Sequence, residues 1–172
     1  MTGQASRNQG PVKVFITGGT IDGLDYDAPE KAPLVHRSLI PDLLKQARVT
    51  LECDVEVLMA KDSRWVTDED RELIAVRCRQ AEADMIVITH GTRTMPLTAK
   101  HLGRQKMNKT IVLLGAAVPA NRDNSDALFN LGTALAAVQT LPAGVYVTMN
   151  GRIFVWDSVR KDLSTGIFHT EQ

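Results

Sequence analysis

The sequence lacks several features that would place it in a specialised class of proteins. Its 20 Lys and Arg residues balance its 20 Asp and Glu residues, and aromatic residues make up only 5%. Neither net charge nor stacking surface therefore favours a nucleic-acid partner. No apolar run approaches the ~20 residues of a membrane span, and the polar first ten residues lack the apolar core of a secretory signal. These absences predict a cytoplasmic protein that does not bind a membrane.

Cysteine is also scarce, since only Cys53 and Cys78 are present. Neither has a second Cys or a His at metal-ligand spacing, so two buried free thiols are favoured over a disulfide or a metal site. We expect neither a metal nor a cofactor. The length of 172 residues fits one domain. We expect a disordered tail over residues 1–10 and a single α/β domain over residues 11–172.

Segments typical of strands alternate with segments typical of helices. The strands are predicted at 12–16, 53–59, 85–89, 110–114, 145–148 and 152–156, and the helices at 39–48, after the capping box of Thr67 and Asp70, at 96–102, and from Asn124 or Ser125 to Gln139. The AsnGly pair at 150–151 predicts a hairpin between the last two strands. This alternation predicts a doubly wound, mostly parallel sheet with flanking helices and a C-terminal β-hairpin.

Three short polar loops each follow a predicted strand. They are ThrGlyGlyThrIleAsp at 17–22, ThrHisGlyThrArgThrMet at 89–95 and GlyAlaAlaValPro at 115–119. Loops at the carboxyl ends of parallel strands meet in one crevice, where open α/β sheets bind small ligands. Two of these loops contain a threonine hydroxyl, at Thr20 and Thr92. We predict that both hydroxyls share a small polar cavity within reach of a single amide.

Other interpretations exist for each loop on its own. A tight turn, in which glycine supplies a positive φ, explains each loop equally well. The glycines at 18, 19 and 23 could also indicate a nucleotide-binding turn. Their spacing does not match GlyxGlyxxGly, and no amphipathic helix begins after them, which weakens that interpretation.

Together, the loops resemble the bacterial-type L-asparaginase family. The resemblance rests on ThrGlyGlyThrIle at 17–21, AspSer at 62–63, HisGlyThrxThrMet at 90–95, and GlyAlaxxPro at 115–119 followed by AspAlaLeuPheAsnLeu at 126–131. It extends from about residue 12 to residue 161 and is strongest to the short-chain form, which corresponds to the amino-terminal domain. It implies L-asparagine as the substrate, no cofactor, and a homodimer or homotetramer.

The resemblance also implies roles for individual residues. Thr20 matches the nucleophilic threonine, and Tyr26 lies where a mobile loop brings a tyrosine to that hydroxyl. Thr92 matches a second catalytic threonine, and Lys161 is the candidate for the lysine that acts with it, with His169 as a weaker competitor. The implied substrate-binding residues are Gly19, Asp62, Ser63, Gly91, Arg93 and Ala116. Such chemistry needs a hydroxyl activated by a neighbouring base and N–H donors for the oxyanion.

Arg93 departs from the family pattern, in which an aspartate at this position holds the α-ammonium of the substrate. Arginine is an obligate donor with a permanent positive charge. Its repulsion of an ammonium is worth several kcal/mol at an effective dielectric of about 20. We therefore predict an impaired L-asparaginase that produces L-aspartate and ammonia. The alternatives are a protein that binds or converts a small dicarboxylate, with Arg93 pairing with the anion, and, less favoured, a nucleotide-binding domain.

Overall fold

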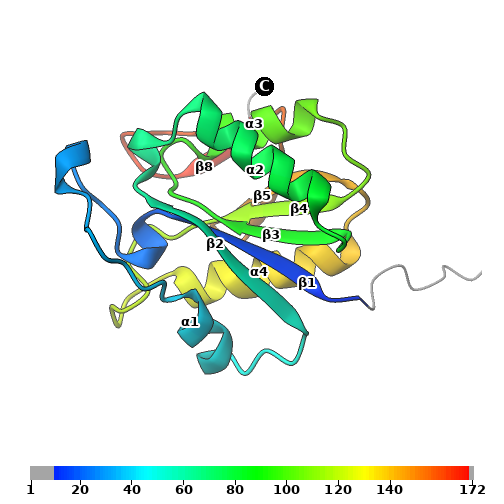
Figure 1. Cartoon of the computed structure of the whole chain (residues 1–172), viewed down its shortest axis with the longest axis horizontal. Helices are drawn as coiled ribbons and strands as arrows, with labels where there is room; N and C mark the ends of the chain where they lie inside the picture. The colour runs from blue at the N-terminus through cyan, green and yellow to red at the C-terminus, as the bar shows by residue number, and fades with distance from the viewer. Residues whose placement is uncertain (1–9, 171–172) are drawn as a thin grey trace, which may run out of the picture.

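The computed structural model describes residues 10–170 and is built around a six-stranded sheet (Figure 1). The strands are β1 (Val12–Gly18), β2 (Cys53–Lys61), β3 (Met85–Thr89), β4 (Thr110–Leu114), β5 (Gly144–Met149) and β6 (Arg152–Val155). Their order is β2-β1-β3-β4-β5-β6, and all pairs are parallel except the antiparallel pair of β5 and β6. The strand order reverses at β1 and β3, so a crevice for ligands is expected at the carboxyl ends of these two strands.

Helices cover both faces of the sheet. The helices are α1 (Ile40–Gln46), α2 (Asp68–Gln80), α3 (Met95–Arg104) and α4 (Ala127–Thr140), with short 3₁₀ helices at Thr20–Asp22, Pro29–Lys31 and Ser63–Trp65. Helices α1 and α4 pack on one face, and α2 and α3 pack on the other (Figure 1). Alternate residues of β3 and β4 enter the two cores, so both strands are buried throughout and form continuous apolar runs.

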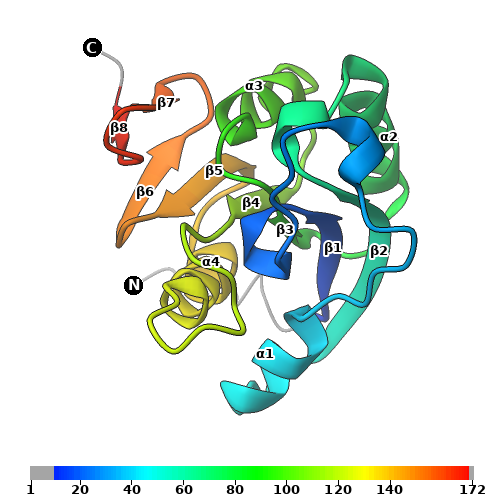
Figure 2. The same ribbon diagram turned by 90° about the vertical axis from the view of Figure 1, so that its left-hand side faces the viewer.

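The predicted fold class is confirmed, including the hairpin between β5 and β6. Its turn residues Asn150 and Gly151 have φ values of 57° and 71°, as a two-residue hairpin turn of this type requires. The sequence did not predict a second, two-stranded sheet made of β7 (Val159–Lys161) and β8 (Phe168–Thr170). Figure 2 shows this small sheet beyond β6 and next to α3.

The predicted helix starts are correct for α2 and wrong for α4. The side chain of Thr67 accepts from the amide of Asp70, and the carboxylate of Asp70 accepts from the amide of Thr67, which completes the capping box. Helix α4 begins at Ala127 rather than directly after Asn124 or Ser125. The Ser125 hydroxyl is held by a carbonyl of the preceding loop, so this residue belongs to the loop and only its oxygen reaches the helix.

Several further expectations concern the ends and the thiols of the chain. The expected tail over 1–10 lies outside the described residues except for Gly10, which is exposed. Both thiols are free, but only Cys78 is buried, while Cys53 is half-buried. Burial raises the pKa of Cys78 to about 12, so this thiol is unreactive. Within residues 10–170 no helix is long and apolar enough to cross a membrane.

The edge strand β6 presents an apolar surface. Ile153 and Val155 are exposed on this strand, and Phe129 of α4 is exposed close to the hairpin turn at Gly151. Self-association of the chain stays a prediction.

Candidate active site

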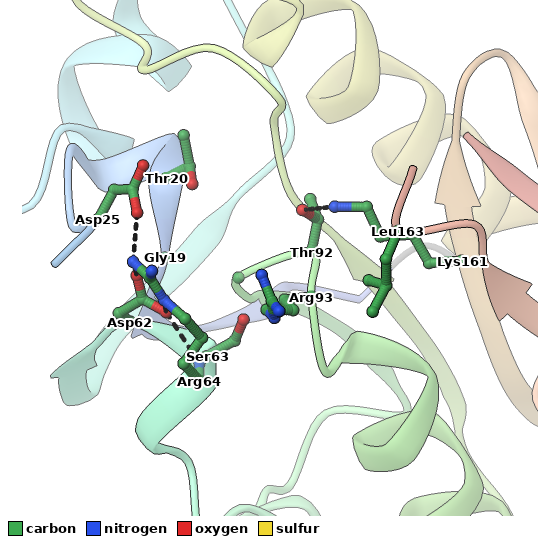
Figure 3. A pocket seen from close by; sticks show the side chains of 11 residues that line it. Gly19, Thr20, Asp25, Asp62, Ser63, Arg64, Thr92, Arg93, Lys161 and Leu163 are labelled. Carbon is green, nitrogen blue, oxygen red and sulfur yellow. Dashed lines mark hydrogen bonds and ion pairs between the residues drawn. The ribbon is translucent and has the colours of Figure 1, made fainter. Parts of the chain in front are cut away.

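The loops after β1 and β3 meet at one cavity of about 310 Å³ (Figure 3). The predicted site residues that line it are Gly19, Thr20, Asp62, Ser63, Gly91, Thr92, Arg93 and Lys161. Thr17, at the end of β1, donates its hydroxyl hydrogen to the Thr89 carbonyl of β3 over 2.7 Å. This bond fixes the two strand ends that carry the loops. Thr20 and Thr92, the two threonines singled out in the sequence, both line this cavity.

Glycine allows the loops to approach each other at backbone contact. A Cβ atom on Gly19, whose φ is 84°, would lie 2.3 Å from the Cα atom of Gly91. A Cβ atom on Gly91 would in turn lie 2.5 Å from the Cβ atom of Ser63. Contacts this short leave no room for a methyl group. The loop after β1, the loop after β3 and the Ser63 turn thus form a single packed unit beneath the cavity.

Gly91→Ala is expected to lower the free energy of unfolding by about 1–3 kcal/mol, because the added methyl group displaces Ser63. Urea unfolding of the variant and the unmodified chain measures this loss. The matched control is Gly132→Ala in α4, where a Cβ atom meets nothing within 4 Å. That change should be neutral or stabilising, since alanine favours a helix over glycine. Equal stability of the Gly91 variant and the unmodified chain would contradict the packing described here.

Thr92 and Lys161 form a direct pair in the cavity wall. The Lys161 Nζ atom donates to the Thr92 hydroxyl over 2.6 Å, although the two residues are 69 positions apart. Lys161 lies on β7, whose Val159 is buried in the core, so the small sheet holds the amine in place. Burial, followed by the positive charge of Arg93, lowers the pKa of Lys161 below its ordinary value. His169, the weaker competitor, is not among the residues that line the cavity.

Asp62 lines the cavity, but both oxygens of its carboxylate already accept hydrogen bonds from other residues. One oxygen accepts from the backbone amide and Nε of Arg64, and the other accepts from an Arg64 guanidinium nitrogen and from the Tyr26 amide. Burial alone would raise the pKa of Asp62, but these hydrogen bonds outweigh it, and the pKa lies below its ordinary value. Arg64 also bonds to Asp25 on the exposed rim. Asp62 thus remains charged and satisfied.

Tyr26 and Ala116 lie outside the cavity lining. The Tyr26 hydroxyl accepts a hydrogen bond from the Asp62 amide over 3.1 Å, and the Trp65 indole donates to the Tyr26 carbonyl. These bonds hold the tyrosine against the Ser63 turn rather than on the Thr20 hydroxyl. Ala116 is buried in the core beneath α4. The catalytic role implied for Tyr26 and the substrate-binding role implied for Ala116 therefore stay predictions.

Comparison with known proteins places the chain in a family. Residues 11–168 match the family described as asparaginase, N-terminal. The chain belongs to the asparaginase family. An L-asparaginase of Thermococcus kodakarensis is 33% identical over 162 residues, which are 90% of this chain and 48% of that protein. A glutamyl-tRNA(Gln) amidotransferase subunit of Aeropyrum pernix is 32% identical over 81% of this chain and 35% of its own length.

Solved structures of asparaginases have the same fold. The thermostable L-asparaginase of Thermococcus kodakarensis superposes with a TM-score of 0.80 at 29% identity and covers 93% of this chain and 51% of its own. A probable cytoplasmic L-asparaginase of Campylobacter jejuni superposes with a TM-score of 0.78 at 31% identity, with coverages of 93% and 52%. The chain thus spans about a third to a half of the length of these asparaginase-family relatives.

A buried histidine supports the asparaginase-family loop after β3. His90 contacts the Gly91 carbonyl through Nδ1 at 2.8 Å and the Thr98 hydroxyl through Nε2 at 2.9 Å. Since a carbonyl only accepts, Nδ1 carries the proton and Nε2 accepts from Thr98. Burial lowers the pKa of His90 to about 4, so the ring is neutral at pH 7. His90 therefore holds the loop that carries Thr92.

The sequence did not single out three residues of the cavity wall, namely Asp25, Arg64 and Leu163. Arg64 immediately follows the AspSer motif, so its place in the sequence could have indicated that it borders the site. Nothing in the sequence indicates that it bonds both carboxylates of the cavity, because Asp25 is 39 residues away along the chain.

Proposed function

We propose that this cavity hydrolyses a carboxamide to a carboxylate and ammonia, with L-asparagine as the reference substrate and Thr20 as the nucleophile. The Thr92–Lys161 hydrogen bond in the cavity that Thr20 lines is the observation that carries the proposal. A hydroxyl is a weak nucleophile until a neighbouring group accepts its proton. The Thr20 hydroxyl has no hydrogen-bond partner within residues 10–170 and is free to attack.

The proposed amide hydrolysis uses the side chains of Thr20, Thr92 and Lys161. The Thr20 oxygen bonds to the amide carbon while its proton passes through Thr92 to Lys161, which must be neutral to accept it. The backbone amides of Gly91 and Thr92, which have no acceptor among the described residues, are donors for the oxyanion. Collapse breaks the C–N bond, and the nitrogen leaves as ammonia with the transferred proton. Water then hydrolyses the threonine ester and restores the Thr20 hydroxyl.

The proposal is tested by ammonia release from the purified chain. Thr20→Val keeps the shape of the side chain but removes the hydroxyl, and we expect kcat/KM to fall by at least about a thousandfold. The matched control is Thr50→Val, at an exposed position outside the cavity, which should retain the full rate. Unchanged ammonia release by the Thr20 variant would rule out Thr20 as the nucleophile.

A further inference from the structure

The cavity contains a permanent positive charge, that of Arg93, which none of its carboxylates pairs with. Five charged side chains line it: Asp25, Asp62, Arg64, Arg93 and Lys161. Both carboxylates bond to the same guanidinium, that of Arg64. Arg93 and Lys161 have no carboxylate partner within residues 10–170. Arg93 thus faces the cavity without a counter-charge from the chain, and Lys161 adds a second positive charge whenever its amine is protonated.

The carboxylates of the cavity offer little to a bound ammonium group. An ionised carboxylate has about four acceptor sites. Asp62 already accepts four hydrogen bonds, three from Arg64 and one from the Tyr26 amide. Asp25 is exposed to solvent at the rim, and its charge is paired with Arg64. An ammonium in the cavity would therefore meet the permanent charge of Arg93, and the only carboxylate with acceptor sites left is Asp25, which is exposed at the rim and already paired with Arg64.

Arg93, in contrast, offers unused hydrogen-bond donors. Its side chain is exposed and lies in the middle of the group in Figure 3, between the Ser63–Arg64 side and the Thr92–Lys161 side. The Ser63 hydroxyl likewise has no partner within the described part of the chain. A guanidinium binds a carboxylate through two parallel hydrogen bonds, and this arrangement adds both energy and geometric selectivity.

We propose that the substrate is a carboxamide that also carries a carboxylate but no ammonium, and we take succinamate, the analogue of L-asparagine that lacks the ammonium group, as the reference compound. This inference rests on the proposed amide hydrolysis and specifies its substrate class. Arg93 holds the carboxylate at one end of the molecule, and Thr20 attacks the amide at the other end. Hydrolysis then yields the dicarboxylate and ammonia, with water as the only co-reactant.

Binding of the product tests the inference without any need for catalysis. Succinate and L-aspartate share a carbon skeleton and differ in the ammonium group. Calorimetric titration of the full chain should give succinate at least about a tenfold lower Kd than L-aspartate. Arg93→Gln should abolish this preference, and Arg93→Asp should reverse it. The control Arg104→Gln, an exposed arginine outside the cavity, should retain it. Equal or tighter binding of L-aspartate by the unmodified chain would overturn the inference.

Ammonia release separates this inference from the proposed reaction. We expect kcat/KM for succinamate to exceed that for L-asparagine by at least about tenfold. Comparable or faster hydrolysis of L-asparagine would overturn the substrate class and support the proposed reaction. Preferential binding of succinate with no ammonia released from either amide would overturn the reaction while supporting recognition of a dicarboxylate.

Discussion

Lys161→Met is expected to lower kcat/KM for amide hydrolysis by about 10²–10⁴-fold, the range in which a positioned general base contributes. Methionine has nearly the length of lysine but cannot accept a proton, and it removes the 2.6 Å hydrogen bond to Thr92. Lys161→Arg should be similarly impaired, because a guanidinium does not deprotonate in proteins. Ammonia release at saturating and subsaturating substrate measures both variants.

The control for this prediction is Arg160→Met, an exposed neighbour on the same strand. It should retain the rate of the unmodified chain. A Lys161→Met variant with near-normal activity would exclude this lysine as the base. Another group would then have to accept the proton of Thr92.

The pH profile offers a second measurement on the same lysine. Because the neutral amine is the active form, the rate should rise with pH through the pKa of Lys161. Burial and then Arg93 lower this pKa, so removing the Arg93 charge raises it. We therefore expect the acid limb of the profile for Arg93→Gln to move to higher pH. A limb that stays in place in that variant would contradict the role of Lys161 as the titrating base.

The second large effect concerns stability rather than catalysis. His90 has a pKa of about 4 in the folded chain, because burial disfavours its charged form, whereas the ordinary value is 6.5. Below pH 6.5 the unfolded chain therefore binds a proton that the folded chain does not. The free energy of unfolding should fall by about 3 kcal/mol as the pH decreases from 6.5 to 4 and should lose no more from this residue below that.

Urea unfolding between pH 7.5 and 4.5 measures this slope. In His90→Gln most of the slope should disappear, because glutamine retains hydrogen-bonding groups but does not titrate. Thr50→Val, which changes an exposed residue that carries no titratable group, should leave the slope of the unmodified chain. Asp62 and Asp70 have lowered pKa values, so their stabilising contributions are lost only at lower pH and are common to all three proteins. An unchanged slope in His90→Gln would contradict the assignment.

Strands that consist of a continuous apolar run could be predicted from the sequence. Strands that form only because they pack against distant segments could not. The bounds of β3 and β4 agree with the prediction at every residue, because both strands are continuous apolar runs between polar loops. The sheet of β7 and β8 has only three residues in each strand. This sheet forms because Val159 and Phe168 are buried in a core that other segments build. Strands of three residues are too short for hydrophobic periodicity to predict them.

The candidate site shows the same division. The positions of Thr20 and Thr92 followed from the rule that loops at neighbouring strand ends converge. Lys161 was chosen by resemblance, and its contact with Thr92 depends on the small sheet that the sequence did not predict. Asp62 was interpreted as a substrate-binding residue. Its acceptors are filled by Arg64, two residues further along the chain, and by Tyr26, so only the packing of two separate segments reveals this arrangement.

The position of Lys161 on β7, late in the chain, determines when during synthesis of the chain the proposed activity can begin. The threonines of the cavity belong to segments that leave the ribosome early, whereas their amine partner lies 69 residues after Thr92. A nascent chain halted before residue 161 can hold both hydroxyls but has no base to activate them. Amide cleavage should therefore begin only after translation has passed residue 161, and it can report when the small sheet has docked.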